Sequence, residues 1–334
     1  MLNTILELPL EIEGVGLERQ ELAVSPEFRR VTTTVRLRGG GKEGRGEDIT
    51  YQADLHDTFP EPSVAGSWTI ASFSESLDGF AFFGAEPVDS AAHDYRRWAW
   101  ESAALDLALR QADTTLAEVA GRGRRPVTYV VSTRVTKVEA HLELYPAMRF
   151  KLDPGPDWDD ATIDRLAELA VVDTADFKGV YRGDFGQPPN PPLYRRIVEA
   201  FPNAWLEDPG LDAETDEVLR PHRHRVTWDA PIHSVDDVLA RPFPPRCLNV
   251  KPSRFGSVRR LFEFYEWCDA NDVALYGGGQ FELGIGRVQI QELASLFHPD
   301  TPNDVAPASF NAPEIPHGEQ ESPLPPPQAF GTRS

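Results

Sequence analysis

The sequence is short of positive charge, of cysteine and of long apolar runs. Its 334 residues carry 33 Lys and Arg against 53 Asp and Glu, a formal net charge of −20. Nucleic acids and anionic membranes bind clustered basic side chains, so neither is expected as a partner. The two cysteines, Cys247 and Cys268, form no CxxC motif, and they support neither a zinc ribbon nor a disulfide scaffold.

No stretch approaches the ~18 uncharged apolar residues of a membrane-spanning helix. The N-terminal residues 1–7 also lack the basic segment and apolar run of a secretory signal. We therefore expect a cytoplasmic protein in a reducing compartment. Hydrophobic residues make up 40% of the chain, which is ordinary for a globular protein and provides for a sizeable core.

The hydrophobic pattern changes along the chain and predicts two domains and a tail. Residues 1–55 alternate apolar and polar positions and contain the glycine turn Gly39–Gly41, which indicates antiparallel strands. Residues 95–120 then follow a helical period. This α+β module is predicted to end at residue 125, before Pro126. The proline-rich residues 313–334 lack periodicity and are predicted to be an extended arm or disordered.

Between the module and the tail, short apolar runs alternate with helical stretches. About eight such runs lie between residues 127 and 306, and alternation of strand and helix implies a parallel sheet. An open doubly wound sheet is possible, but eight units with right-handed crossovers favour a closed barrel over residues 126–312.

A charged residue follows each of five successive predicted strands. These residues are Lys151, Asp176, Glu207, Asp229 and Lys251. The carboxyl ends of barrel strands converge on one mouth, so the five side chains are expected to meet. Three carboxylates between two lysines are costly without a cation, and hard oxygen ligands suit Mg²⁺. The pattern predicts a metal site at the barrel mouth, although each carboxylate alone is commonly a helix cap or a surface ion pair.

These segments resemble the enolase superfamily, within it the branch of muconate-lactonizing enzymes and o-succinylbenzoate synthases. The similar segments are Arg149–Lys151, Asp176–Gly179, Glu207–Pro209, Asp229–Ala230 and Lys251–Gly256 in the barrel, with Gly44–Glu47 and Ser102–Ala108 in the first module. The resemblance implies an α+β capping domain on a modified (β/α)₇β barrel. It also implies Asp176, Glu207 and Asp229 as metal ligands for Mg²⁺, with Lys151 and Lys251 as catalytic residues.

The sequence departs from the family pattern at three positions. Arg149 replaces a lysine, Lys178 stands where asparagine is expected, and Ala230 replaces an acidic residue. An ammonium group beside a metal would be repelled unless Lys178 points outward or pairs with a substrate carboxylate. Asp173 is the rival of Asp176 as the ligand after the third barrel strand, and the spacing to Gly179 favours Asp176.

The expected reaction is Mg²⁺-assisted removal of a proton α to a substrate carboxylate, giving an enediolate. A lyase, dehydratase or cycloisomerase of the o-succinylbenzoate synthase kind is preferred. The alternatives are a racemase or epimerase, and a non-catalytic barrel that binds a ligand. The partner is a small carboxylic acid, and a homo-oligomer is possible.

Substrate contacts are expected from both parts of the chain. Arg149 and Lys178 would suit a second substrate carboxylate, and Gly278 and Gly279 would let backbone N–H groups approach an anion. In the capping domain, the segment Glu13–Leu17, with Phe59 and Trp68, is expected to close over the distal part of the substrate.

Overall fold

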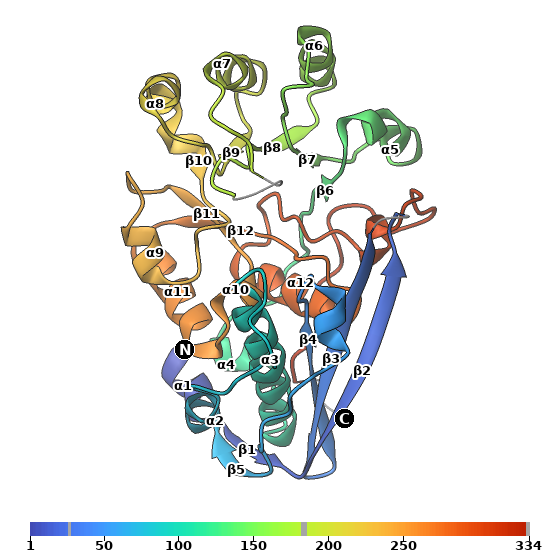
Figure 1. Cartoon of the computed structure of the whole chain (residues 1–334), viewed down its shortest axis with the longest axis vertical. Coiled ribbons are helices and arrows are strands. Elements are labelled where there is room, and N and C mark those ends of the chain that lie inside the picture. Colours follow the sequence, from blue (N-terminus) through green and yellow to red (C-terminus); the bar gives the residue numbers. More distant parts are fainter. Residues whose placement is uncertain (26–27, 182–185, 332–334) are drawn as a thin grey trace.

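The first third of the chain is a layer of strands packed on helices, and the rest is a ring of parallel strands with helices outside it (Figure 1). The computed structural model describes residues 1–25, 28–181 and 186–331. Within these ranges no helix is long and apolar enough to cross a membrane.

The N-terminal part contains two antiparallel sheets, as the alternating pattern predicts. One consists of β2 (Gly14–Ala23), β3 (Arg29–Gly39) and β4 (Lys42–Asp48), and the other pairs β1 (Pro9–Ile12) with β5 (Gly66–Thr69). Its helices are α1 (Leu2–Leu6), α2 (Ile70–Ser76), α3 (Ala92–Gln111) and α4 (Leu116–Ala120). The turn between β3 and β4 uses positive φ angles at Gly40 and Gly41, +56° and +69°, which glycine adopts without steric cost.

The segment Gly44–Glu47 joins the two parts of the molecule. A β-carbon on Gly44 or Gly46 would lie 2.3 or 2.1 Å from a backbone oxygen of α3, so glycine lets β4 lie directly on that helix. Glu47 then accepts hydrogen bonds from the N–H groups of Leu283, Gly284 and Gly286. Its carboxylate therefore satisfies the N-terminal donors of the last barrel helix.

Gly46→Ala is expected to destabilise the fold by about 1–3 kcal/mol, because the new methyl group must displace helix backbone rather than a flexible side chain. The measurement is urea unfolding followed by circular dichroism. Gly14→Ala is the matched control, since a β-carbon at Gly14 meets no atom within 4 Å. Equal midpoints for the two variants would contradict the packing explanation.

In the described residues, seven parallel strands form most of the barrel, and their order in the sequence is their order in space. They are β6 (Val131–Ser132), β7 (Phe150–Leu152), β8 (Val172–Asp176), β9 (Trp205–Glu207), β10 (Val226–Thr227), β11 (Cys247–Val250) and β12 (Ala274–Gly277). A bond from Asn249 N to Trp228 O joins β10 to β11. Residues 303–304 bridge in parallel to Gly278 and to Tyr129, so they act as the eighth strand and close the ring. The predicted closed barrel is confirmed, and the open sheet is excluded.

A helix follows each of the seven strands and returns the chain to the next. These helices are α5 (Val138–Leu144), α6 (Asp160–Leu169), α7 (Pro191–Ala200), α8 (Ala213–Leu219), α9 (Val235–Leu239), α11 (Val258–Ala270) and α12 (Ile285–Phe297), with the single turn α10 (Pro252–Phe255) before α11. The architecture is therefore a (β/α)₇β barrel with an α+β cap, the predicted fold class.

The described part of the proline-rich tail, residues 313–331, is an extended arm. Leu324 pairs with Val127 in an antiparallel bridge, and Phe330 is completely buried. Glu292 of α12 accepts hydrogen bonds from the N–H groups of Ala329 and Phe330 at 2.6 and 2.7 Å. Residues 313–331 thus follow the arm alternative, and residues 332–334 lie outside the described residues.

The expectation that Glu13–Leu17 closes over the barrel is wrong. These residues pair with the end of β3, including Leu37 and Arg38, whereas the opposite end of the β2–β3 hairpin reaches the barrel, where Phe28 packs on Phe281 with ring centroids 6.1 Å apart. The register of the hairpin, which the sequence pattern did not fix, decides which end faces the mouth.

Phe59 and Trp68 also contact the cap itself. The guanidinium of Arg96 lies 4.2 Å from the ring centroid of Phe59, and the indole N–H of Trp68 donates to the carbonyl of Val64. These two rings stabilise the capping part internally.

Candidate active site

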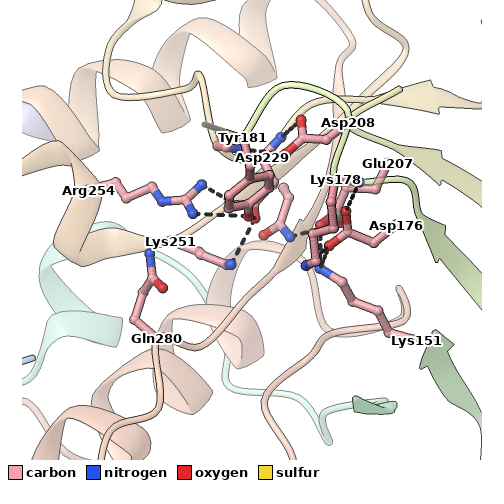
Figure 2. A network of polar contacts seen from close by, with 12 residues as sticks. Lys151, Asp176, Lys178, Tyr181, Glu207, Asp208, Asp229, Lys251, Arg254 and Gln280 are labelled. Atoms are coloured by element: carbon pink, nitrogen blue, oxygen red, sulfur yellow. Dashed lines mark hydrogen bonds and ion pairs between the residues drawn. The ribbon is translucent and has the colours of Figure 1, made fainter. Parts of the chain in front are cut away.

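Figure 2 shows a buried network of charged side chains at the carboxyl ends of the barrel strands. All five residues predicted from the strand ends lie in it, and each is at most 7% exposed: Lys151, Asp176, Glu207, Asp229 and Lys251. The barrel brings these five side chains together, because consecutive parallel strands end on the same side of it.

Glu207 is the centre of one half of the network. Its carboxylate accepts hydrogen bonds from the Lys151 ammonium, from the Tyr276 hydroxyl and, at 3.1 Å, from Asn249 Nδ2. Burial is the main cause that raises the pKa of Glu207 to about 8, and the neighbouring carboxylates of Asp176 and Asp229 add to it. Glu207 therefore lies where burial and two further carboxylates disfavour its negative charge.

Asp229 is the centre of the other half. Lys251 Nζ lies 2.8 Å from Asp229 Oδ2, and Arg254 Nη1 lies 2.7 Å from Oδ1. The Tyr181 hydroxyl donates to Oδ2 at 3.1 Å. Burial alone would raise the pKa of Asp229, but Arg254 and Lys251 outweigh it and hold this pKa far below the ordinary value. Asp229 thus pairs with two basic side chains and holds Lys251 in place.

The two lysines reach the acidic side chains from different directions. Lys151 comes from β7 and contacts Glu207 and, at 3.2 Å, Asp176, whereas Lys251 follows β11 and contacts Asp229. In Figure 2 their ammonium groups stand on two sides of the network. This arrangement places two amines around one small volume.

Sequence reasoning missed Asp208. One oxygen from each of Asp176, Glu207 and Asp208 lies within 4.8 Å of the others, so Asp208 belongs to the acidic group. Strand alternation would place Asp208 opposite Glu207, but its φ of +46° turns the chain back. The adjacent pair of carboxylates before Pro209 was the available signal.

Asp208 also anchors the backbone that follows β10. Its two carboxylate oxygens accept the N–H groups of Asp229 and Ala230, each at 2.8 Å. Burial, followed by repulsion from Asp229 and Asp176, raises the pKa of Asp208 to about 7. Asp208 therefore orients Asp229 through the backbone.

The donor set fits a hard divalent cation. Carboxylate oxygens of Asp176, Glu207 and Asp208 converge, and Asp229 is close enough to raise the pKa of Glu207. No cysteine or histidine belongs to this group among the described residues. All-oxygen sets of this kind are typical of Mg²⁺, Mn²⁺ and Ca²⁺ sites rather than zinc sites.

Lys178 points into the acidic group rather than outward. Its ammonium contacts Asp176 Oδ2, and its backbone N–H donates to Asp176 Oδ1 at 3.1 Å. Burial lowers the pKa of Lys178, but the attraction of Asp176 and Asp153 outweighs this and leaves the pKa above its ordinary value. A third ammonium group thus lies in the site.

Arg149, predicted to bind substrate, is not in this network. Its guanidinium pairs with Asp173, and Asp173 lies on the face of β8 opposite to Asp176 because their positions differ by an odd number. This pairing removes Arg149 from the mouth and Asp173 from the candidate ligands. Asp176 is the carboxylate of β8 that joins the acidic group.

Gly278 and Gly279 lie at the mouth, but their N–H groups do not point to a substrate anion as predicted. Their N–H groups already donate to Val250 O and Asp304 O, each at 3.0 Å, and so close the barrel. A β-carbon on Gly278 would lie 2.6 Å from Lys251 Cε. The missing side chain at Gly278 therefore makes room for Lys251.

A second polar network connects the cap to Asp229. When the side-chain amide of Gln280 is oriented so that its oxygen faces donors, this oxygen accepts hydrogen bonds from Arg254 Nε at 2.9 Å and from the Tyr95 hydroxyl at 3.2 Å, and the amide nitrogen donates to Tyr51. Arg30 of β3 donates to the carbonyls of Gln280 and Phe281. The capping part therefore fixes Arg254 and the loop after β12.

Comparisons with known proteins agree with the capped barrel fold. The N-succinylamino acid racemase of Thermus thermophilus is 26% identical over 91% of this chain and 84% of that protein. The o-succinylbenzoate synthase of Bacillus subtilis is 26% identical, over 63% of this chain and 58% of that protein. Among solved structures, muconate lactonizing enzyme from Pseudomonas putida has a TM-score of 0.66 and 17% identity, and covers 96% of both chains.

The capped barrel is that of the enolase superfamily, a class of metal-dependent lyases and isomerases. Within this class, the chain belongs to the family described as domain of unknown function DUF8230. The N-terminal domain of that family matches residues 3–119, and the C-terminal domain matches residues 123–312.

Proposed function

We propose that this chain removes the proton next to the carboxylate of a small organic acid, with Lys151 and Lys251 as the proton-transferring groups. The observation that carries the proposal is the pair of buried ammonium groups that reach one acidic network from β7 and β11. In this proposal residues 1–125 cap the barrel of residues 126–312, and residues 313–334 are the proline-rich tail, of which residues 313–331 are described as an extended arm.

The proposed cofactor is Mg²⁺, held by Asp176, Glu207 and Asp229. A magnesium ion supplies positive charge that stabilises carboxylate oxygens as negative charge develops on them. Asp208 positions Asp229 through the backbone bonds described above. The dipeptide epimerase of Methylococcus capsulatus, which has the same fold at a TM-score of 0.65 and 17% identity, is described as complexed with a magnesium ion.

Each lysine has a defined task in the proposal. A lysine removes a proton only when it is neutral, and burial lowers the pKa of Lys251 from its ordinary value. The carboxylates around Lys151 favour its charged form, so when Lys251 removes the proton, Lys151 would return one or stabilise negative charge, and in racemisation the two roles reverse for the other enantiomer. The absence of a side chain at Gly278 leaves room for Lys251.

The proposed substrate carries a second carboxylate. The names of two relatives, N-succinylamino acid racemase and o-succinylbenzoate synthase, share a succinyl group. Lys178 supplies a further cation at the mouth, with its side chain 22% exposed. A succinyl-bearing acid is therefore preferred to a monocarboxylic acid.

Two reactions share this first step. Elimination of water, or ring formation, needs one base, whereas racemisation needs a proton donor on each face of one carbon. The position of the two lysines on different sides of the network favours racemisation as the second candidate.

Incubation in D₂O tests the proposal. With Mg²⁺ and N-succinyl-phenylalanine, we expect the α-proton signal in the NMR spectrum to disappear as deuterium enters. N-acetyl-phenylalanine is the matched control, because it lacks the second carboxylate, and it is expected to exchange at least about tenfold more slowly, the loss expected when one charge-assisted contact is missing.

The products separate the candidates. Deuterium in both enantiomers supports racemisation, and loss of water from a hydroxylated succinyl substrate supports a lyase. Absence of exchange with a panel of mono- and dicarboxylic acids, in folded protein loaded with Mg²⁺, would contradict proton abstraction and favour a barrel that only binds ligand.

A further inference from the structure

We infer that the ammonium group of Lys178 is an internal substitute for the metal ion. It neutralises Asp176 in metal-free protein and must leave Asp176 when a divalent cation binds. The inference rests on the proposed function, because it concerns the same site, and it adds a residue that regulates metal binding.

The backbone holds Lys178 against Asp176. Lys178 has a φ of +53°, a left-handed conformation that residues with a β-carbon rarely adopt. From there its N–H group donates to one oxygen of Asp176 and its ammonium contacts the other. One residue therefore uses both oxygens of a proposed metal ligand. A divalent ion on the same carboxylate requires the ammonium to move, because two cations at this distance repel each other.

The choice of lysine at this position is informative. Only five of the 33 basic residues in the chain are lysines, and three of them, Lys151, Lys178 and Lys251, lie in the acidic network. Arginine binds a carboxylate through a rigid planar fork, whereas lysine carries a compact charge on a flexible stem. Lysine is therefore better suited than arginine to a position where the charged group must move.

The structure also provides a place for the displaced ammonium. Asp153 Oδ1 lies 3.6 Å from Lys178 Nζ, and the Asp153 side chain is 46% exposed at the end of β7. The ring centroid of Tyr181 lies 5.1 Å from the same nitrogen. Lys178 can therefore turn toward Asp153 and the mouth, where its charge is available to a second substrate carboxylate.

A double-mutant cycle tests this exchange by calorimetric titration of metal-free protein with MgCl₂. Lys178→Met removes the competing charge and is expected to tighten Mg²⁺ binding about tenfold or more, the value of one hydrogen bond to a charged group. Asp153→Asn removes the alternative partner. Asp153→Asn is expected to weaken Mg²⁺ binding more in wild type than in the Lys178→Met background, because only in wild type does a displaced ammonium group need a new partner. Lys137→Met is the matched control, because Lys137 lies outside the acidic network and donates to the carbonyl of Pro313.

A second readout needs no substitution in the site. Amine labelling of the wild-type protein, located by mass spectrometry, should increase at Lys178 on addition of Mg²⁺ and stay constant at Lys137. Equal Mg²⁺ affinity of wild type and Lys178→Met, or labelling of Lys178 that Mg²⁺ does not change, would overturn the inference and leave the proposed function intact. Absence of Mg²⁺ binding by both proteins would overturn both.

Discussion

Replacing Lys251 by methionine is expected to lower the rate of α-proton exchange by about 10²- to 10⁴-fold, the usual contribution of a positioned acid or base. Methionine keeps the length of the side chain and removes the amine. Lys251 contacts Asp229, whereas Lys151 contacts Glu207, and in the proposed reaction the two amines would face different sides of the substrate.

For this reason the two lysine variants should differ in the enantiomer they lose. With N-succinyl-phenylalanine in D₂O, Lys251→Met should stop exchange of one enantiomer and Lys151→Met that of the other, if racemisation is the reaction. A one-base lyase would instead lose exchange in both variants. Lys137→Met should match wild type, and a site variant that still exchanges both enantiomers at more than about a tenth of the wild-type rate would contradict the assignment of the lysines.

Asp176→Asn is expected to weaken Mg²⁺ binding by about 100-fold or more, since loss of a group that merely orients a ligand already costs about 10- to 100-fold. Asp173→Asn is the matched control three residues earlier on the same strand. The carboxylate of Asp173 pairs with Arg149, so the Asp173→Asn variant should bind Mg²⁺ with the affinity of wild type.

The comparison is made by calorimetric titration, with the unfolding temperature of each variant measured in parallel. An effect of Asp173→Asn as large as that of Asp176→Asn would contradict the position of the site. Equal and unchanged affinities in both variants would show that the ion binds elsewhere.

The sequence predicted the barrel well because its signal is repeated. Each strand is a short apolar run, each is followed by a helix, and the charged residue at the end of one strand recurs at the next. Parallel pairing then brings Lys151, Asp176, Glu207, Asp229 and Lys251 together without any detailed knowledge of the loops. The glycines of Gly44–Glu47 were recognisable as a motif, but their close approach to α3 was not.

The parts that failed depend on single backbone torsions and on side-chain direction. Asp208 enters the acidic group because its φ is positive, which no alternation pattern indicates. The neighbouring strand carries Asp173 on one face and Asp176 on the other. The sequence does not show which of them Arg149 contacts, and in the structure Arg149 pairs with Asp173. The same is true of Lys178, for which the sequence left an outward and an inward position open.

The cap was the least predictable region. The hairpin of β2 and β3 could present either end to the barrel, since alternation defines the faces of a strand but not its register with distant elements. The contact between Phe28 and Phe281 spans most of the chain, and no local pattern reports it.

Anomalous diffraction from a crystal soaked with Mn²⁺ tests the central claim most directly, because Mn²⁺ takes the same oxygen ligands as Mg²⁺. The account predicts one strong peak bound by Asp176 and Glu207, with Asp229 or Asp208 as a third ligand, and with the Lys178 ammonium displaced from Asp176. A peak away from these carboxylates, or no peak at a manganese concentration that saturates binding in solution, would contradict it.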